Sequence, residues 1–165
     1  MTDLGTLGGA QSGASDINSN GQIVGVADTG TGDSHAFSTF GSTMVDLGTL
    51  GGSFSDAISI NNLGQIVGVS TVIGENNHAF YYINGSMYDL NDLTLNASGW
   101  VLESAQAINN LGQIVGSGQL NGIQTAFLLS PIVIPEPSSW AAMAGIGAAC
   151  LAFVLRGRRH REILK

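Results

Sequence analysis

Residues 21–25 read Gly-Gln-Ile-Val-Gly, and the same five residues recur at 64–68 and at 112–116. An Ile-Asn pair begins four residues before each copy, at positions 17, 60 and 108. The first two copies are 43 residues apart, and the third follows a five-residue insertion around 96–103. Self-similarity at such a period is typical of repeat proteins. The sequence therefore predicts three copies of one structural unit.

Other elements of the unit recur with the same period. Asp-Leu-Gly-Thr-Leu-Gly-Gly occupies 3–9 and 46–52, and Met1, Met44 and Met87 each lie two residues before a repeated Asp. The chain thus begins inside a repeat, and its start lacks the basic and apolar regions of a signal peptide. We expect an incomplete chain, either the C-terminal part of a longer protein or one with a mis-assigned start.

Each copy reads as four short strands joined by tight turns. In the first copy, a strand ends at 17–18 and the turn Asn18-Ser19-Asn20-Gly21 follows, with residue types that favour a hairpin. The second strand is expected at 22–27, and its run at 23–27 is apolar without alternation, which indicates cover on both faces, with Gly25 allowing a neighbouring backbone to approach. The third and fourth strands are expected at 34–40 and 43–47.

Four strands in about 43 residues match the size of a β-propeller blade. We therefore predict an all-β repeat domain over residues 1–129, with copies at about 3–45, 46–88 and 89–129. Propellers usually close with about four to eight blades, so three copies are too few. The alternatives are an open stack of sheets, a β-solenoid or an incomplete chain, and the position of Met1 favours the last.

The repeated elements resemble the HAF family of extracellular repeats, named for the His-Ala-Phe found here at 35–37 and 78–80. The resemblance covers about residues 3–129. The third copy departs from the pattern, since residues 90–93 replace the Gly-rich turn and Thr125 replaces the histidine. The resemblance implies a surface or secreted location and no established catalytic role.

The charge is divided unevenly along the chain. Residues 1–155 contain eleven acids and no Lys or Arg, whereas the last ten contain five bases and one acid. Because the body has no positive side chain to neutralise phosphates, nucleic acid is not expected as a partner. The single cysteine, Cys150, excludes an intrachain disulfide and zinc sites built on several cysteines.

Residues 138–155 form an uncharged run of 18 residues. As a helix the run would span about 27 Å, close to the thickness of a bilayer core. Trp140 suits an interface position, and the basic tail at 156–165 would stay in the cytoplasm, with the acidic body outside. We predict a transmembrane helix at 138–155 that contacts membrane lipid, after a Pro-containing linker at 130–137.

Pro135-Glu136-Pro137 directly precedes this apolar run. A Pro-Glu-Pro tripeptide, an apolar span and a terminal arginine cluster together resemble the PEP-CTERM sorting signal of Gram-negative bacteria, over residues 133–161. The resemblance implies that exosortase recognises Pro135, Glu136 and Pro137 and processes the protein during export. It implies that the cluster stops transfer and sets orientation through Arg156, Arg158, Arg159 and Arg161.

The candidates for chemistry have structural interpretations. His35 and His78 could be metal ligands, but a histidine hydrogen-bonded beside its strand is the simpler interpretation. Asp3, Asp46 and Asp89 lie in no calcium-loop motif, so we expect each to cap a turn through backbone N–H groups. Acids in the variable loops are expected to be solvated: Asp28, Asp33 and Glu75. Cys150 is expected to act as a small hydrophobe. No catalytic signature is visible, so no enzyme, metal or cofactor is predicted.

The sequence thus predicts a bacterial protein exported through the inner membrane, anchored there transiently, and then displayed on the surface or secreted. Its expected role is structural or adhesive, with extracellular polysaccharide as a possible partner. The alternative is a ligand-binding propeller that captures a glycan or an ion at its loop tips. A secreted hydrolase is the least favoured interpretation.

Overall fold

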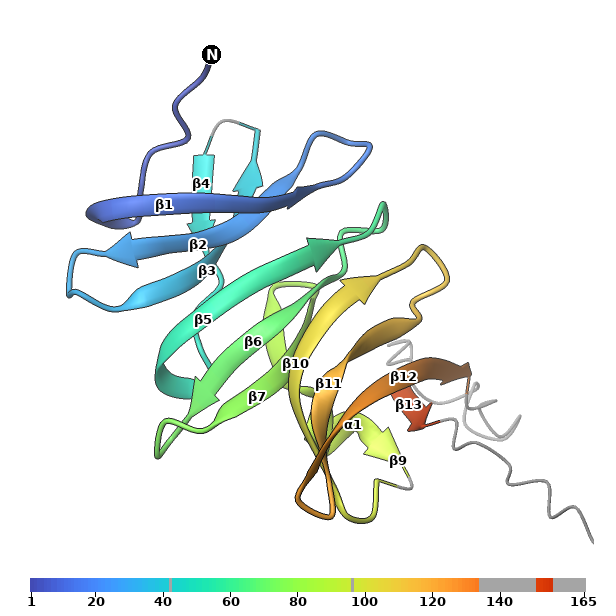
Figure 1. The fold of residues 1–165 in the computed structure, drawn as a ribbon. Coiled ribbons are helices and arrows are strands. Elements are labelled where there is room, and N and C mark those ends of the chain that lie inside the picture. Colours follow the sequence, from blue (N-terminus) through green and yellow to red (C-terminus); the bar gives the residue numbers. More distant parts are fainter. Residues whose placement is uncertain (42, 96, 134–150, 156–165) are drawn as a thin grey trace, which may run out of the picture.

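The computed structural model describes residues 1–41, 43–95, 97–133 and 151–155 (Figure 1). Repeats 1, 2 and 3 below are the copies at 3–45, 46–88 and 89–129. The described part is almost entirely β, which confirms the predicted all-β class. Repeat 1 holds β1 (Gly8–Ile17), β2 (Ile23–Thr29), β3 (Ser34–Phe40) and β4 (Thr43–Asp46). Repeat 2 holds β5 (Gly51–Ile60), β6 (Ile66–Val72), β7 (Asn77–Ile83) and β8 (Ser86–Asp89).

The third part of the chain begins with an insertion, α1 (Leu90–Leu93) and β9 (Thr94–Leu95). It continues with β10 (Trp100–Ile108), β11 (Ile114–Leu120), β12 (Ile123–Val133) and β13 (Leu151–Leu155). Asp89 caps α1, because its side chain accepts a hydrogen bond from the Asn91 backbone nitrogen. The residues that depart from the Gly-rich turn thus form one helical turn.

The strands of each repeat are antiparallel neighbours in chain order. The hairpin predicted at 18–21 is present, since Asn18 N donates to Gln22 O and Gly21 N donates to Asn18 O. Gly21 adopts φ +77°, where a side chain would be strained. Gly25 is needed for a different reason, because a Cβ there would lie 2.0 Å from Gly13 O. Both glycine predictions are confirmed.

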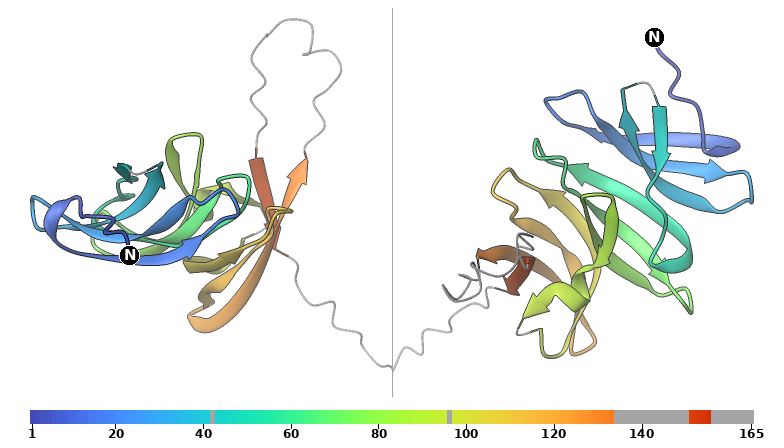
Figure 2. Two further views of the ribbon diagram at one scale, coloured as in Figure 1. Left: turned by 90° about the horizontal axis from the view of Figure 1, so that it is seen from above. Right: turned by 180° about the vertical axis from the view of Figure 1, so that it is seen from behind.

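The core lies between repeats, which stack face to face (Figure 2). Val24 and Ala36 of repeat 1, together with Leu47 directly after β4, pack on a set from repeat 2: Ala57, Ile60, Ile66 and Phe80. The equivalent residues pack again one repeat later. Val67, Ala79 and Leu90 meet Ala105, Ile108, Ile114 and Phe127. One interface is therefore used twice, and the described strands form an open stack and not a closed ring.

The end of the described chain corrects the predicted helix at 138–155. Its last five residues form strand β13, which pairs antiparallel with β12 and parallel with β9. Pairing satisfies backbone groups at an open sheet edge, and Phe153 is fully buried with its ring centroid 5.5 Å from that of Tyr81. Residues 138–150 lie outside the described part. None of the helices among the described residues has the length and apolarity to span a bilayer.

The predicted linker at 130–137 also begins later than expected, because residues 130–133 continue β12. Pro131 is accommodated there opposite Phe153. The extended, apolar Ile132 and Val133 pair with Ala152 and Leu151.

Candidate functional site

All of the sorting residues predicted from the sequence lie outside the described residues. Pro135, Glu136, Pro137 and the four arginines all belong to that part. The structure does place the two ends of the intervening segment, since Val133 at the end of β12 is the register partner of Leu151 at the start of β13. The two described residues that flank 134–150 are therefore neighbours in the sheet.

An asparagine ladder connects the three repeats along their hairpins. Asn18 Nδ2 donates to Asn61 O at 3.1 Å, and Asn61 Nδ2 donates to Asn109 O at 3.0 Å. Each of these side chains also holds its own turn. In repeat 2, for example, Asn61 Oδ1 accepts from Leu63 N and Gln65 N. The repeated Ile-Asn element thus both shapes the hairpin and joins it to the next repeat.

A second set of polar contacts runs beside the ladder. Asp16 Oδ2 accepts from Ser59 Oγ and from Ile60 N, both at 3.0 Å. Ser59 takes the same role one repeat later, where its Oγ accepts from Ile108 N at 3.5 Å. The acid at position 16 is consequently a structural group in the contact between repeats 1 and 2.

The repeat histidines each pair with a repeat aspartate. His35 Nδ1 lies 2.9 Å from Asp46, and His78 Nδ1 lies 2.5 Å from Asp89. The same carboxylates cap turns, since Asp46 Oδ1 accepts from Gly48 N. Asp3 caps Gly5 in the same way. The predictions of strand-side histidines and turn-capping aspartates are both confirmed, and the pairing between the two residues was not predicted.

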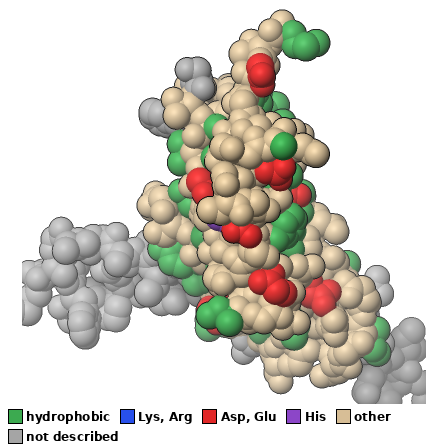
Figure 3. All heavy atoms as spheres, turned by 90° about the vertical axis from the view of Figure 1, so that its left-hand side faces the viewer, with side chains coloured by type: hydrophobic (Ala, Val, Ile, Leu, Met, Phe, Trp, Pro, Cys, Tyr) green, Lys and Arg blue, Asp and Glu red, His purple; other side chains and the backbone are tan. Residues whose placement is uncertain are grey.

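The acidic side chains are dispersed over the surface. Figure 3 shows them spread across one face of the stack, with no Lys or Arg among the described residues. Two of the acids expected in loops accept local hydrogen bonds: Asp28, which lies on β2 and not in a loop, from Ser34 Oγ, and Glu75 from Ser53 Oγ. Within the described ranges, no group of three or more potential metal ligands occurs.

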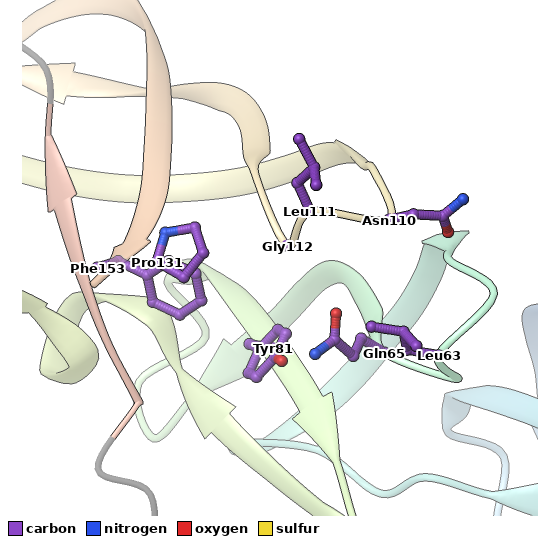
Figure 4. Close-up of a pocket in the computed structure, with 8 residues that line it drawn as sticks. All are labelled: Leu63, Gln65, Tyr81, Asn110, Leu111, Gly112, Pro131 and Phe153. Atoms are coloured by element: carbon purple, nitrogen blue, oxygen red, sulfur yellow. The ribbon is translucent and has the colours of Figure 1, made fainter. Parts of the chain in front are cut away.

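A small pocket of about 140 Å³ lies between repeats 2 and 3 (Figure 4). Tyr81 and Gln65 supply polar groups, and Phe153 and Pro131 close one side. The Tyr81 hydroxyl oxygen is buried without a hydrogen-bond partner among the described residues. Burial raises the pKa of Tyr81 to about 12, an effect that the nearby Gln65 side chain opposes. Its volume is below the roughly 300 Å³ of ordinary small-molecule sites, and none of the described residues that line it is charged.

The surroundings of Asp56 disfavour the charge on its carboxyl group. Its Oδ1 atom is buried without a hydrogen-bond partner in the described part of the chain. Burial raises the pKa of this carboxyl above its ordinary value. The equivalent residues in the other repeats are Gly13 and Ser104, so the repeat itself does not require a charge at this position.

Two patterns in the sequence could have predicted the asparagine contacts and the histidine–aspartate pairs. Asparagine and glutamine recur four residues apart in every copy, at 18/22, 61/65 and 109/113. Histidine and aspartate recur eleven residues apart in the first two copies. Side chains of fixed spacing that lie on neighbouring strands or turns are candidates for pairing, because the repeat brings them to the same relative position each time.

Comparison with known proteins identifies the C-terminal segment. Residues 133–159 match the family model for the PEP-CTERM protein-sorting motif. No curated protein and no solved structure matches the chain. Signals of this kind are recognised by exosortase. They mark a bacterial exported protein that is anchored transiently in the membrane and then displayed on the surface or secreted.

Proposed function

We propose that the repeat body is a non-catalytic structural or adhesive module of the bacterial exterior, delivered there by its sorting motif. The observation that carries this proposal is the match of residues 133–159 to the PEP-CTERM motif. The body supports it, because the polar side chains that recur with the repeat are used in contacts within and between repeats.

The repeats are proposed to be extracellular repeats of the HAF type with a propeller-like stacking. The His-Ala-Phe and Gly-Gln-Ile-Val-Gly elements support the family assignment. Antiparallel four-stranded units whose faces pack on one another support the stacking. The partner proposed for this surface is extracellular polysaccharide, whose hydroxyl groups suit the Asn-, Ser- and Thr-rich loops.

The sorting roles follow from the motif. Pro135, Glu136 and Pro137 form the element that exosortase reads, and the arginines hold the tail on the cytoplasmic side. Replacing Arg156, Arg158, Arg159 and Arg161 together by Glu should impair retention and orientation in an exosortase-containing bacterium. Cell fractionation measures this, with Glu75→Gln as a control in an exposed loop. Unchanged localisation of the arginine variant would refute the sorting roles.

Glycan capture at loop tips is the second candidate function, and binding experiments separate it from a purely structural role. The chain is incubated with extracellular polysaccharide from its host and sedimented. A structural or adhesive module associates with the bulk polymer. A capture site shows saturable binding that a soluble oligosaccharide competes away. Absence of saturable binding to any glycan would exclude the capture site.

A further inference from the structure

The interface between repeats has two different faces, which we name by their residues. The leading face of a repeat packs on the repeat after it, through residues equivalent to Val24 and Ala36. The trailing face packs on the repeat before it, through residues equivalent to Ala57 and Ile60. Repeat 2 uses both faces, whereas in the described part of the chain the trailing face of repeat 1 and the leading face of repeat 3 pack on no further repeat.

Both unused faces are exposed. On the trailing face of repeat 1, Ile17 is 60% exposed, although Ile60 and Ile108 at the same position are 5% and 8% exposed. On the leading face of repeat 3, Val115 is 42% exposed, whereas Val24 and Val67 are fully buried. The neighbouring positions agree with this pattern, since Ala14, Ala126 and Leu128 are exposed. Each end thus exposes part of the apolar surface that is covered inside the stack, although Phe37, the equivalent of Phe80, is buried in repeat 1.

The hydrogen bonds of the asparagine ladder also lack a partner repeat at both ends of the described stack. Asn109 Nδ2 bonds to Gln113 within its own turn but to no other repeat among the described residues, whereas Asn18 and Asn61 each reach across. At the other end, Asn18 O accepts from Gly21 N and from no other described residue, although Asn61 O also accepts from the preceding Asn18. The donor that is free at repeat 3 matches the acceptor that is free at repeat 1.

We propose that the leading face of repeat 3 docks on the trailing face of repeat 1 of a second copy of this chain. The occupant is argued from the interface inside the chain, because the same apolar positions and the same asparagine ladder would be continued across the contact. Such a head-to-tail contact is heterologous, so it produces a ring where the rotation closes and a filament where it does not. This inference goes beyond the proposed function, because it requires only folded repeats and not export.

The new contact is weaker than the two inside the chain. Ala107 stands where Asp16 and Ser59 offer an oxygen to the next repeat, so one hydrogen-bond acceptor is missing. The acidic bodies also repel each other, since residues 1–155 contain no Lys or Arg. Association is therefore expected to depend on protein concentration and to increase with ionic strength, which screens this repulsion.

The test is sedimentation of the full chain in mild detergent, with one charge introduced on each face. Ile17→Asp and Val115→Asp should each remove self-association. The two substituted side chains are exposed, so circular dichroism and the unfolding midpoint should stay unchanged. An equimolar mixture of the two variants should regain 1:1 dimers, because each contributes its intact face. Ile73→Asp, on a turn and 86% exposed, is the control and should assemble like the unchanged chain.

Three results would overturn the proposal. The first is a chain that stays monomeric at all concentrations, as it would if these faces accept only further repeats of its own chain. The second is loss of assembly in only one of the two variants, which indicates a symmetric contact between like faces. The third is assembly that neither substitution affects, which points to association through the C-terminal segment in detergent.

Discussion

Asn18, Asn61 and Asn109 occupy one position of the repeat and differ in what their side chains contact. All three hold their own turn, but only the first two donate across to the next repeat. The exposure of Asn109 reflects its place at the end of the stack. A residue with a local role in every copy thus gains a second role wherever a neighbouring repeat is present.

Replacing Asn61 by Ala should lower the free energy of unfolding by about 2 kcal/mol, because part-buried turn N–H groups and the Asn109 carbonyl lose their partner. Asn109→Ala is the matched control, since it removes the same turn contacts without a contact between repeats. Its effect should be smaller by about 1 kcal/mol. Urea denaturation measures both. Equal losses would show that the ladder adds nothing to stability.

Asp56 predicts a dependence of stability on pH. Its pKa in the folded chain lies above the ordinary value of 3.8, because burial disfavours the charged form. The contribution of protonated Asp56 to the stability of the fold is therefore complete below pH 3.8. It is lost as the pH rises through the pKa that Asp56 has in the folded chain. Asp56→Asn should raise the melting temperature at about pH 7 and lose that advantage near pH 3. The exposed Asp92→Asn is the control, and an equal gain from it would indicate general charge repulsion instead.

At the scale of elements, the repeat units follow from local patterns and the chain end does not. The turn residues and the uninterrupted apolar run at 23–27 predict the hairpin and a buried second strand, because both depend on neighbouring residues. The strand formed by 151–155 depends on partners far away, β12 and β9. An uncharged apolar run suits a membrane helix or a buried strand edge, and composition alone does not distinguish these two.

Docking of β13 predicts a stability effect at Phe153. This side chain is fully buried and packs edge to face on Tyr81. Phe153→Ala should lower the free energy of unfolding by about 3 kcal/mol, the usual cost of emptying a buried aromatic site. Leu95→Ala on β9, 47% exposed, is the control and should change stability little. Denaturation in urea measures both variants. An unchanged midpoint for Phe153→Ala would mean that β13 contributes nothing to the folded body.

At the scale of the whole molecule, the division of charge and the stack of repeats belong together. A body without Lys or Arg lies before a sorting motif whose basic residues are confined to the last ten positions. The sequence could predict this division of charge and the sorting motif, because both are patterns of consecutive residues. The two open faces could not be predicted, since they depend on which residues the stacked repeats bury.

The intact mass of the chain recovered from the cell exterior tests the central claim of sorting and processing most directly. Residues 1–155 contain no Lys or Arg, so trypsin can cut this chain only from Arg156 onward. A chain processed near Pro135–Pro137 should lack the tail, and trypsin should leave its mass unchanged. Recovery of an unprocessed 16.9 kDa chain outside the cell, shortened by trypsin at its end, would contradict the account. Confinement of the body to the cytoplasm would contradict it equally.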